Sequence, residues 1–322
     1  MAVCGGADRA IGIRKIAMEI VHGLPQPINE RATALTIGAF DGVHRGHQHL
    51  ISATVRRARA QSYQSAVMTF DPHPDLVLNP QSKRLYLADL EERAELIAGL
   101  GVDLLIVLPF SQEIMALDAR EFMERTCKAV ALRELVVGWD FALGRQREGN
   151  LTRLREIGRE IGYSVHPAAQ FALDGTPVSS TRIRAALSAG DVEGAANLLG
   201  RPFTVRGQIV QGDQRGRMIG FPTANLAVDR LRMLPCDGVY VCTTSRGGHR
   251  YGAVTNVGLR PTFDGTRRTV EAYLLDFVGD LYGEVLRLEF RHRLRGEQKF
   301  EGVGALVAQI NRDVAAARKW LK

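Results

Sequence analysis

The chain has 322 residues and a formal net charge of +7 at pH 7, a length that suits about two domains of ordinary size. Hydrophobic residues make up 45% of the chain, as in globular proteins, and no run approaches the ~18 consecutive apolar residues of a membrane span. The first residues lack the compact apolar block of a secretory signal, so we expect a cytoplasmic protein that makes no membrane contact.

The positive charge is concentrated in the last third of the chain. Residues 1–200 hold 22 basic and 23 acidic residues, whereas residues 201–322 hold 20 and 12. A basic region favours phosphate-bearing ligands. Nucleic acid is disfavoured, because the sequence has no zinc finger, no RNA-recognition signature and no aromatic–basic interleaving. The four cysteines form no CxxC pair and no cluster with zinc spacing, which predicts reduced thiols.

Residues 1–15 have no convincing period, and we expect them to form a flexible tail. From residue 16 to 168, strand-like apolar runs alternate with helix-like stretches. Strands are predicted at 34–40, 65–70, 102–108 and 134–138, and helices at 46–61, 89–100 and 118–131. Alternation of this kind predicts a parallel sheet with helices on both faces, whose ligands bind beyond the carboxyl ends of the strands. The polar segments GAFDGVHRGH, TFDPHP and VGWDFALG all fall at such ends.

The pattern changes after a helical stretch at 180–199, and LLGRPF (198–203) marks the change. Five short strand-like runs follow, separated by glycine, aspartate and proline: FTVRGQIVQ, VYVCTTS, RYGAVTNVG, TVEAYLLDF and EVLRLEF. They predict a small antiparallel barrel or sandwich, and an amphipathic helix closes the chain at 303–321. We therefore expect an α/β domain at 16–199 and a β domain at 200–322.

The segment GAFDGVHRGH places two histidines, His44 and His47, on a loop that leads into a helix. A helix N-terminus offers free N–H groups and the positive end of the helix dipole, so it binds phosphates. Gly38, Gly42 and Gly46 permit close approach of the backbone to such a ligand. Histidines placed there can donate hydrogen bonds to phosphate oxygens while an α-phosphorus is attacked. His49, one step further along, is expected to be structural or exposed.

The whole string resembles the HxGH nucleotidyltransferase superfamily, and its FDGVH form resembles the adenylyltransferase domain of prokaryotic bifunctional riboflavin kinase/FAD synthetases. TFDPHP (69–74), VGWDFALGRQREG (137–149) and SSTRIR (179–184) continue the resemblance in order, with Asn150 and Trp139 as small departures. It implies a Rossmann-like fold, catalysis by His44 and His47, and nucleotide contacts by Gly38, Phe40, Asp41, His73, Asp140, Arg147, Ser180, Thr181 and Arg184. Without the other motifs, SSTRIR could also be an ordinary helix cap.

The second motif, GRMIGFPTANL (216–226), is polar and lies in the strand-rich region. Thr223 offers a hydroxyl and Asn225 a carbonyl oxygen, both hard ligands suited to Mg²⁺, and Gly220 and Pro222 impose a specific backbone path. The motif resembles riboflavin kinase. The resemblance implies that Thr223 and Asn225 hold a magnesium–nucleotide complex, and that Gly220 and Pro222 lie at the nucleotide site. The implied fold is a riboflavin kinase-like barrel.

Glu271 is our candidate for the general base of the second site. It lies on a predicted strand, on the face opposite Val270, Ala272 and Leu274. A kinase that acts on a sugar-alcohol hydroxyl needs a positioned carboxylate to accept the proton. Taken alone, a glutamate in a strand is more often a solvated charge, and the resemblance is what favours a catalytic role.

The resemblance implies two reactions. ATP phosphorylates riboflavin to FMN, and a second ATP adenylylates FMN to FAD with release of pyrophosphate, with Mg²⁺ neutralising phosphate charge in both. We expect a monomer or weak homo-oligomer. Three alternatives stay open: a riboflavin kinase with an inactive nucleotidyltransferase half, a nucleotidyltransferase for another acceptor such as pantetheine phosphate or nicotinate mononucleotide, and a flavin- or nucleic-acid-binding protein without activity. His44, His47 and Arg184 argue against the first, and GFPTAN against the second.

Overall fold

A computed structural model describes residues 18–24, 31–79, 81, 84–212, 215–262 and 265–322, so the expected tail at 1–15 lies outside the described residues. The chain forms two compact units. The first comprises Met1–Gly38, Ile51–Asp71 and Ala94–Ala168, and the second comprises Ala39–Leu50, Pro72–Arg93 and Ala169–Lys322. The second unit thus draws segments from both sides of the domain boundary expected at residue 199, and that boundary stays a prediction.

The first unit contains a parallel sheet of six strands in the order β1-β4-β3-β2-β5-β6, which confirms the predicted α/β architecture. The strands are β1 (Glu19–His22), β2 (Thr33–Ile37), β3 (Gln64–Phe70), β4 (Leu104–Leu108), β5 (Leu132–Gly138) and β6 (Ser164–Ala168). Its helices are the greater part of α1 (Arg45–Ala60), most of α3 (Leu90–Ala98), α4 (Gln112–Ala116), α5 (Ala119–Val130) and α6 (Leu151–Ile161), and a short 3-10 turn covers Arg145–Arg147.

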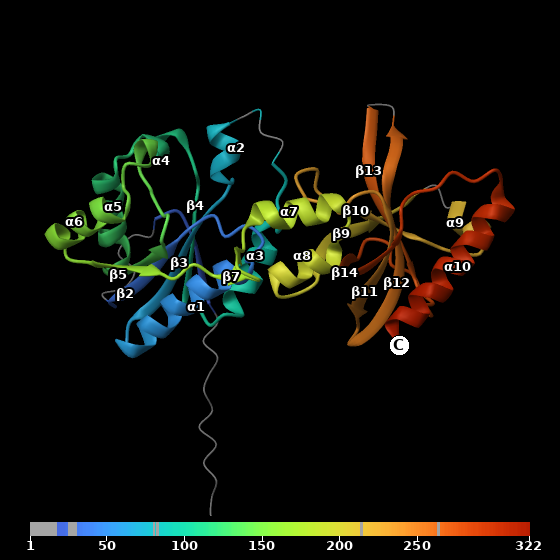
Figure 1. Ribbon diagram of the computed structural model, residues 1–322, viewed down its shortest axis with the longest axis horizontal. Coiled ribbons are helices and arrows are strands. Elements are labelled where there is room, and N and C mark those ends of the chain that lie inside the picture. The colour runs from blue at the N-terminus through green and yellow to red at the C-terminus, as the bar shows by residue number, and fades with distance from the viewer. Residues whose placement is uncertain (1–17, 25–30, 80, 82–83, 213–214, 263–264) are drawn as a thin grey trace, which may run out of the picture. The chain divides into compact units, whose positions relative to one another are not determined.

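Both faces of this sheet are covered, as the burial of β2 demonstrates. Leu35 and Ile37 pack in one cluster with Phe122 of α5 and Leu154 of α6. Thr36 points to the other face and is equally buried. A parallel sheet needs helices on both faces because its crossover connections run there, and Figure 1 shows helices on either side of these strands.

The second unit contains a closed barrel in the order β10-β13-β12-β11-β14-β9, with antiparallel neighbours. The strands are β9 (Phe203–Val210), β10 (Ala224–Ala227), β11 (Gly238–Arg246), β12 (His249–Thr262), β13 (Gly265–Leu274) and β14 (Val285–Arg295). The unit also contains α2 (Pro74–Leu78), α7 (Ser180–Ala189), α8 (Val192–Leu199), α9 (Arg215–Met218), α10 (Val303–Leu321) and the hairpin of β7 (Ala172–Leu173) with β8 (Thr176–Pro177). The barrel, rather than the sandwich, is confirmed.

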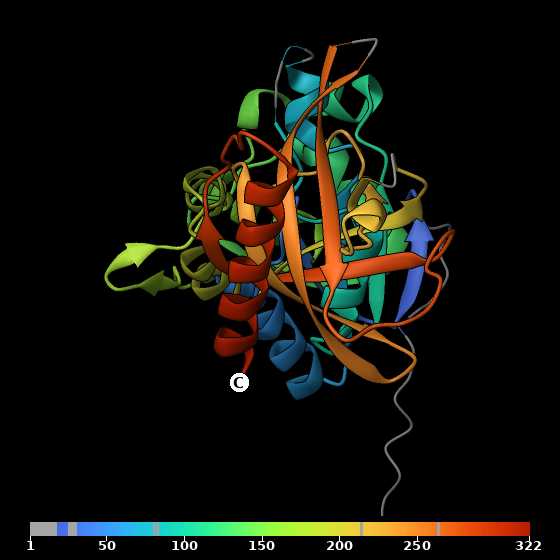
Figure 2. The ribbon, with the colours of Figure 1, turned by 90° about the vertical axis from the view of Figure 1, so that its right-hand side faces the viewer.

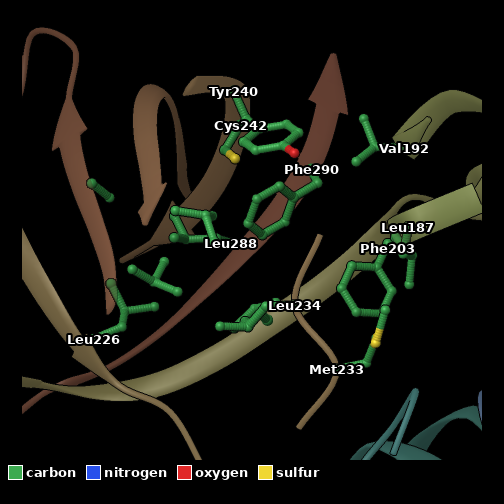
Figure 3. Packing of buried hydrophobic residues seen from close by; sticks show 14 of the residues in the cluster. Leu187, Val192, Phe203, Leu226, Met233, Leu234, Tyr240, Cys242, Leu288 and Phe290 are labelled. Carbon is green, nitrogen blue, oxygen red and sulfur yellow. The ribbon is translucent and has the colours of Figure 1, made fainter. Parts of the chain in front are cut away.

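Helix α10 lies against the outer wall of the barrel, on β11, β12 and β14 (Figure 2). Inside the barrel, Phe203, Tyr240 and Phe290 fill the core (Figure 3). Leu187 of α7 and Val192 of α8 belong to the same apolar cluster, so these two helices pack onto the barrel. Among the described residues, no helix is long and apolar enough to cross a membrane.

Candidate active sites

The loop between β2 and α1, residues 38–44, has an unusual backbone. Phe40, Gly42 and Val43 take positive φ angles of 48°, 79° and 39°. For a β-branched residue such as Val43 this conformation is strained, and strain of this kind persists only where the surroundings hold it in place. Phe40 and Val43 are both buried, so their apolar side chains anchor the loop to the protein interior. The expected strand 34–40 is therefore wrong at its end, because β2 stops at Ile37.

His44 and His47 lie together at the start of α1. Their rings stack with centroids 3.6 Å apart and an angle of 18° between planes. The backbone N–H of His47 donates to Nδ1 of His44 at 3.3 Å, so a neutral His44 carries its proton on Nε2. Burial lowers the pKa of His44 to about 4, and the charges of Arg201 and Arg184 act in the same direction. Burial also lowers the pKa of His47. Both pKa shifts favour neutral rings at pH 7, and a neutral His44 has an N–H at Nε2 available to donate.

The glycine between the two histidines has a steric reason. A Cβ atom on Gly46 would lie 3.1 Å from Cε1 of the His44 ring, a tight contact that would require the ring to shift by a few tenths of an ångström. Nδ1 of His47 is buried, and within the described part of the chain it has no hydrogen-bond partner. The spacing of HxGH therefore lets the two rings stack without a side chain between them.

Asp41, Ser180 and Arg184, three residues predicted from different motifs, meet in the structure. The buried carboxylate of Asp41 accepts the backbone N–H of Leu87 at 2.9 Å and forms an ion pair with Arg184. The hydroxyl of Ser180 donates to the carbonyl oxygen of Asp41 at 3.1 Å. Nη1 of Arg184 is buried and, among the described residues, has no partner, which leaves a guanidinium donor for a ligand. Asp41 therefore holds Arg184 and Ser180 in place through buried contacts.

Ser180 and Thr181, the first two residues of α7, do not cap the helix. Ser179 is the N-cap, because its hydroxyl accepts the backbone N–H of Arg182 at 3.3 Å. Ser180 and Thr181 form the first turn, and Thr181 is exposed. The helix-cap alternative for SSTRIR therefore applies to Ser179 alone.

His73 is buried and caps α2, since its Nδ1 accepts the backbone N–H of Asp75 at 3.1 Å. Its Nε2 lies 3.3 Å from Nη1 of Arg84. Burial lowers the pKa of His73, and Arg84 lowers it further. Asp41 and Arg184 also shift it, in opposite directions, so His73 lies within electrostatic reach of that ion pair.

Asp140 and Arg147 lie in the first unit, on the loop after β5, and both are exposed. Nη2 of Arg147 donates to the carbonyl oxygen of Asp140 at 3.3 Å, so the structure brings these two predicted residues together. Asn150 is the N-cap of α6, where its side chain accepts the N–H of Arg153. Aspartate caps helices equally well, which explains why this departure from the family pattern is harmless.

Two residues that the motifs did not single out hold the β2–α1 loop. Arg201 donates to the carbonyl oxygens of Gly42 at 2.9 Å and Val43 at 3.4 Å. Gln48 donates to the carbonyl oxygens of Val43 and Leu199, both at 2.8 Å. Neither residue stands out in the sequence, because hydrogen bonds to backbone carbonyls leave no pattern of residue types.

The second site is built by strand register on the outer wall of the barrel. Glu271 of β13 pairs directly with Asn225 of β10 on one side and with Asn256 of β12 on the other. Directly paired residues project to the same face of a sheet, with Cβ atoms ~5 Å apart. Val270 and Ala272, the neighbours of Glu271, are buried inside the barrel, which confirms the predicted facing.

Two cavities meet at Thr223. The first, of about 370 Å³, contains Glu271, Asn256 and Thr223 in its wall. Aromatic and aliphatic side chains complete it, among them Phe221, Tyr273, Phe300, Leu306 and Ile310. The second, of about 530 Å³, is lined by Thr223, Pro222 and the segment 277–282. Thr223 therefore borders both the aromatic cavity and the larger second one.

The loop before β10 approaches the site closely at Gly212. A Cβ atom on Gly212 would lie 2.3 Å from Nδ2 of Asn225, and Gly220 takes a φ of 87°. Thr223 and Asn225, the two expected metal ligands, supply hydroxyl and carbonyl oxygens. Mg²⁺ prefers such hard donors and completes its shell with water and phosphates, so these residues fit the ion. Within the described ranges, no group of three or more histidine, cysteine or acidic side chains could hold a metal.

The fold and the two candidate sites fit a transferase, and two family models match the corresponding segments. A FAD synthetase model matches residues 26–182, and a riboflavin kinase model matches residues 199–321. The bifunctional riboflavin kinase/FMN adenylyltransferase of Pseudomonas fluorescens is 40% identical over 304 residues, covering 94% of this chain and 97% of that protein. The protein of the same name from Escherichia coli K12 is 37% identical, covering 93% and 96%.

The chain belongs to the family of bifunctional riboflavin kinase/FMN adenylyltransferases. Both domains are present, which supports the bifunctional interpretation over a kinase alone. A solved structure named as a macrolide-efflux protein from Streptococcus pneumoniae is 33% identical and has a TM-score of 0.86, covering 94% of this chain and all of that one. Its name describes a different activity from that of the curated relatives.

Proposed function

We propose that the chain makes FMN from riboflavin and ATP on the outer wall of the barrel, and FAD from FMN and a second ATP at the β2–α1 loop. The observation that carries the proposal is the pairing, within one chain, of a stacked neutral histidine pair at a helix start with a carboxylate that faces an aromatic cavity beside Thr223. Each arrangement suits one of the two reactions that the family performs.

In the kinase step, Glu271 accepts the proton of the terminal ribityl hydroxyl. The hydroxyl oxygen attacks the γ-phosphorus of ATP, and the bond between that phosphorus and the ADP oxygen breaks. The aromatic cavity of about 370 Å³ suits the flat flavin ring, and the cavity of about 530 Å³ suits the nucleotide. Thr223 and Asn225 would hold Mg²⁺ together with ATP, and Gly220 and Pro222 shape the loop beside them. The ion neutralises phosphate charge when bound.

In the adenylyl step, a phosphate oxygen of FMN attacks the α-phosphorus of ATP, and pyrophosphate leaves. Neutral His44 and His47 donate N–H groups to the phosphate oxygens on which charge develops. Nη1 of Arg184 and the first turn of α7, with Ser180 and Thr181, bind the polyphosphate. Further nucleotide contacts are proposed for the family-motif residues Gly38, Phe40, Asp41, His73, Asp140 and Arg147.

A chromatographic assay with riboflavin, ATP and Mg²⁺ tests the proposal. We expect FMN to form first, followed by FAD with one equivalent of pyrophosphate. Accumulation of FMN without FAD would leave the kinase alone. Offering pantetheine phosphate or nicotinate mononucleotide in place of FMN should yield no adenylylated product, and turnover of either at the rate of FMN would contradict the assigned acceptor.

A further inference from the structure

The strained β2–α1 loop raises the question of what holds it. Gly42 and Val43 both take positive φ angles, and Val43 is β-branched. Glycine adopts a positive φ freely, but Val43 is strained in this conformation, and surrounding contacts must offset that strain. Since His44 follows directly, any relaxation of these two peptides would redirect its ring.

Arg201 and Gln48 supply the contacts on the carbonyl side of the loop. The guanidinium of Arg201 forks over two successive peptides, with Nη2 2.9 Å from the oxygen of Gly42 and Nη1 3.4 Å from that of Val43. Gln48 reaches the oxygen of Val43 at 2.8 Å. The two carbonyls immediately before His44 are therefore both anchored by side chains that the motifs did not implicate.

The acidic neighbour of Arg201 does not depend on it. Glu92 is buried, and its Oε2 lies 2.8 Å from Nη2 of the buried Arg232. Thr204 also donates its hydroxyl to Glu92. Arg201 lies farther away, 3.8 Å from Oε1, than from the loop carbonyl of Gly42. Glu92 is thus satisfied by the barrel, and the shortest contact of Arg201 is with the loop.

The charge of Arg201 also acts on His44. After burial, Arg201 and Arg184 are the charges that lower the pKa of His44. A protonated His44 could not accept the N–H of His47 at Nδ1, so a neutral ring is needed for the observed stacking geometry. Arg201 thus favours one state of His44 in two ways, by holding the loop and by keeping the ring neutral. In that state Nδ1 accepts the N–H of His47, and Nε2 carries the proton that can be donated.

We propose that Arg201 is a positioning residue for adenylyl transfer, which fixes the direction of the His44 Nε2–H by gripping the carbonyls of Gly42 and Val43. The inference rests on the proposed function of this loop. Arg201 acts through His44 and binds neither the transferred AMP nor the flavin. Misplacing a catalytic group by ~1 Å can reduce a rate about 100-fold, which sets the size of the expected effect.

The test compares Arg201→Gln and Arg201→Lys in the full chain. For Arg201→Gln we expect kcat of FAD formation from FMN to fall about 100-fold, while KM for ATP and the rate of riboflavin phosphorylation stay within about twofold. Arg201→Lys keeps the charge opposite Glu92 but loses the planar fork, so a loss of about tenfold is expected. Wild-type FAD formation is measured alongside, and its absence would refute the function of the loop rather than the role of Arg201.

Thr204→Val is the matched control, because it removes a hydrogen bond from Glu92 and leaves the loop untouched. Both of its activities should stay within about twofold of wild type. An unchanged kcat of FAD formation in Arg201→Gln would overturn the proposal. So would a loss of riboflavin phosphorylation in Arg201→Gln as large as its loss of FAD formation. A loss of FAD formation in Thr204→Val as large as that in Arg201→Gln would overturn it as well. If Arg201→Gln fails to fold, Arg201→Lys decides, since a wild-type kcat there would equally overturn it.

Discussion

The two sites are positioned in different ways. At the β2–α1 loop, hydrogen bonds among protein groups fix the side chains: His44 accepts the N–H of His47, and Asp41 holds Leu87 and Arg184. On the barrel, strand register places Glu271 directly beside Asn225. A loop with positive φ angles needs dedicated supports, whereas an antiparallel sheet positions neighbouring side chains through its own ladder.

This difference predicts where each activity is vulnerable. Adenylyl transfer should respond to substitutions behind the loop that never touch a ligand. Riboflavin phosphorylation should respond mainly to residues that line the two cavities around Thr223. The four predictions that follow test this contrast.

The largest effect is expected for Glu271→Gln, which keeps the shape of the side chain and removes the base. Riboflavin phosphorylation should fall about 10³-fold, within the range for loss of a general base, and conversion of FMN to FAD should persist. Separate assays starting from riboflavin and from FMN measure the two steps. Glu289→Gln is the control, because Glu289 pairs with Arg291 outside the cavities. Loss of both activities in Glu271→Gln would show that the sites are not separable.

The next effect concerns the histidine pair. His44→Ala and His47→Ala should each reduce FAD formation about 100-fold, as expected for loss of a donor to developing charge, with phosphorylation of riboflavin retained. His49→Ala serves as the control, because His49 packs near Phe171 and lies outside the stacked pair. FAD formation at the wild-type rate in His47→Ala would remove His47 from the mechanism.

The comparison also bears on what a sequence can predict. The HxGH site was predictable in part from physics, because histidines and glycines at a helix start suit phosphate. Glu271 was assigned from the resemblance. Its pairing with Asn225 and Asn256 is a long-range property, which local sequence patterns do not encode. The parallel sheet followed from strand patterns, which left a barrel and a sandwich open for the second domain. The end of β2 at Ile37 could not be predicted in this way. Phe40 is apolar and buried like a strand residue, but it lies in the loop after the strand.

Two features were beyond the reach of sequence patterns. The packing of α7 and α8 in one core with the barrel depends on contacts such as Leu187 with the cluster of Phe203, which no local period encodes. The grip of Arg201 on the loop joins residues about 160 positions apart through backbone oxygens, which every residue type carries. Supports that act on backbone are therefore found only in three dimensions.

A smaller effect is expected when the HxGH glycine gains one methyl group. In Gly46→Ala the added Cβ would press on the His44 ring from 3.1 Å, so FAD formation should fall about tenfold with phosphorylation unchanged. Gly304→Ala in α10 is the matched control, because a Cβ there meets nothing within 4 Å. Steady-state kinetics of both steps in both variants would measure this. Equal behaviour of the two variants would mean that the His44 ring tolerates the contact.

The smallest effect concerns stability and pH. His44 has a pKa of about 4 in the folded chain and about 6.5 when exposed on unfolding. Between these values the unfolded chain binds a proton that the folded chain does not, so stability falls as pH drops from 6.5 towards 4. His44→Asn removes this difference in proton binding. From pH 7 to pH 5, the wild type should lose on the order of 1–2 kcal/mol more unfolding free energy than His44→Asn. Urea titrations at both pH values measure the difference, and parallel losses would mean that His44 titrates normally and that the neutral, preorganised donor proposed for the loop is absent.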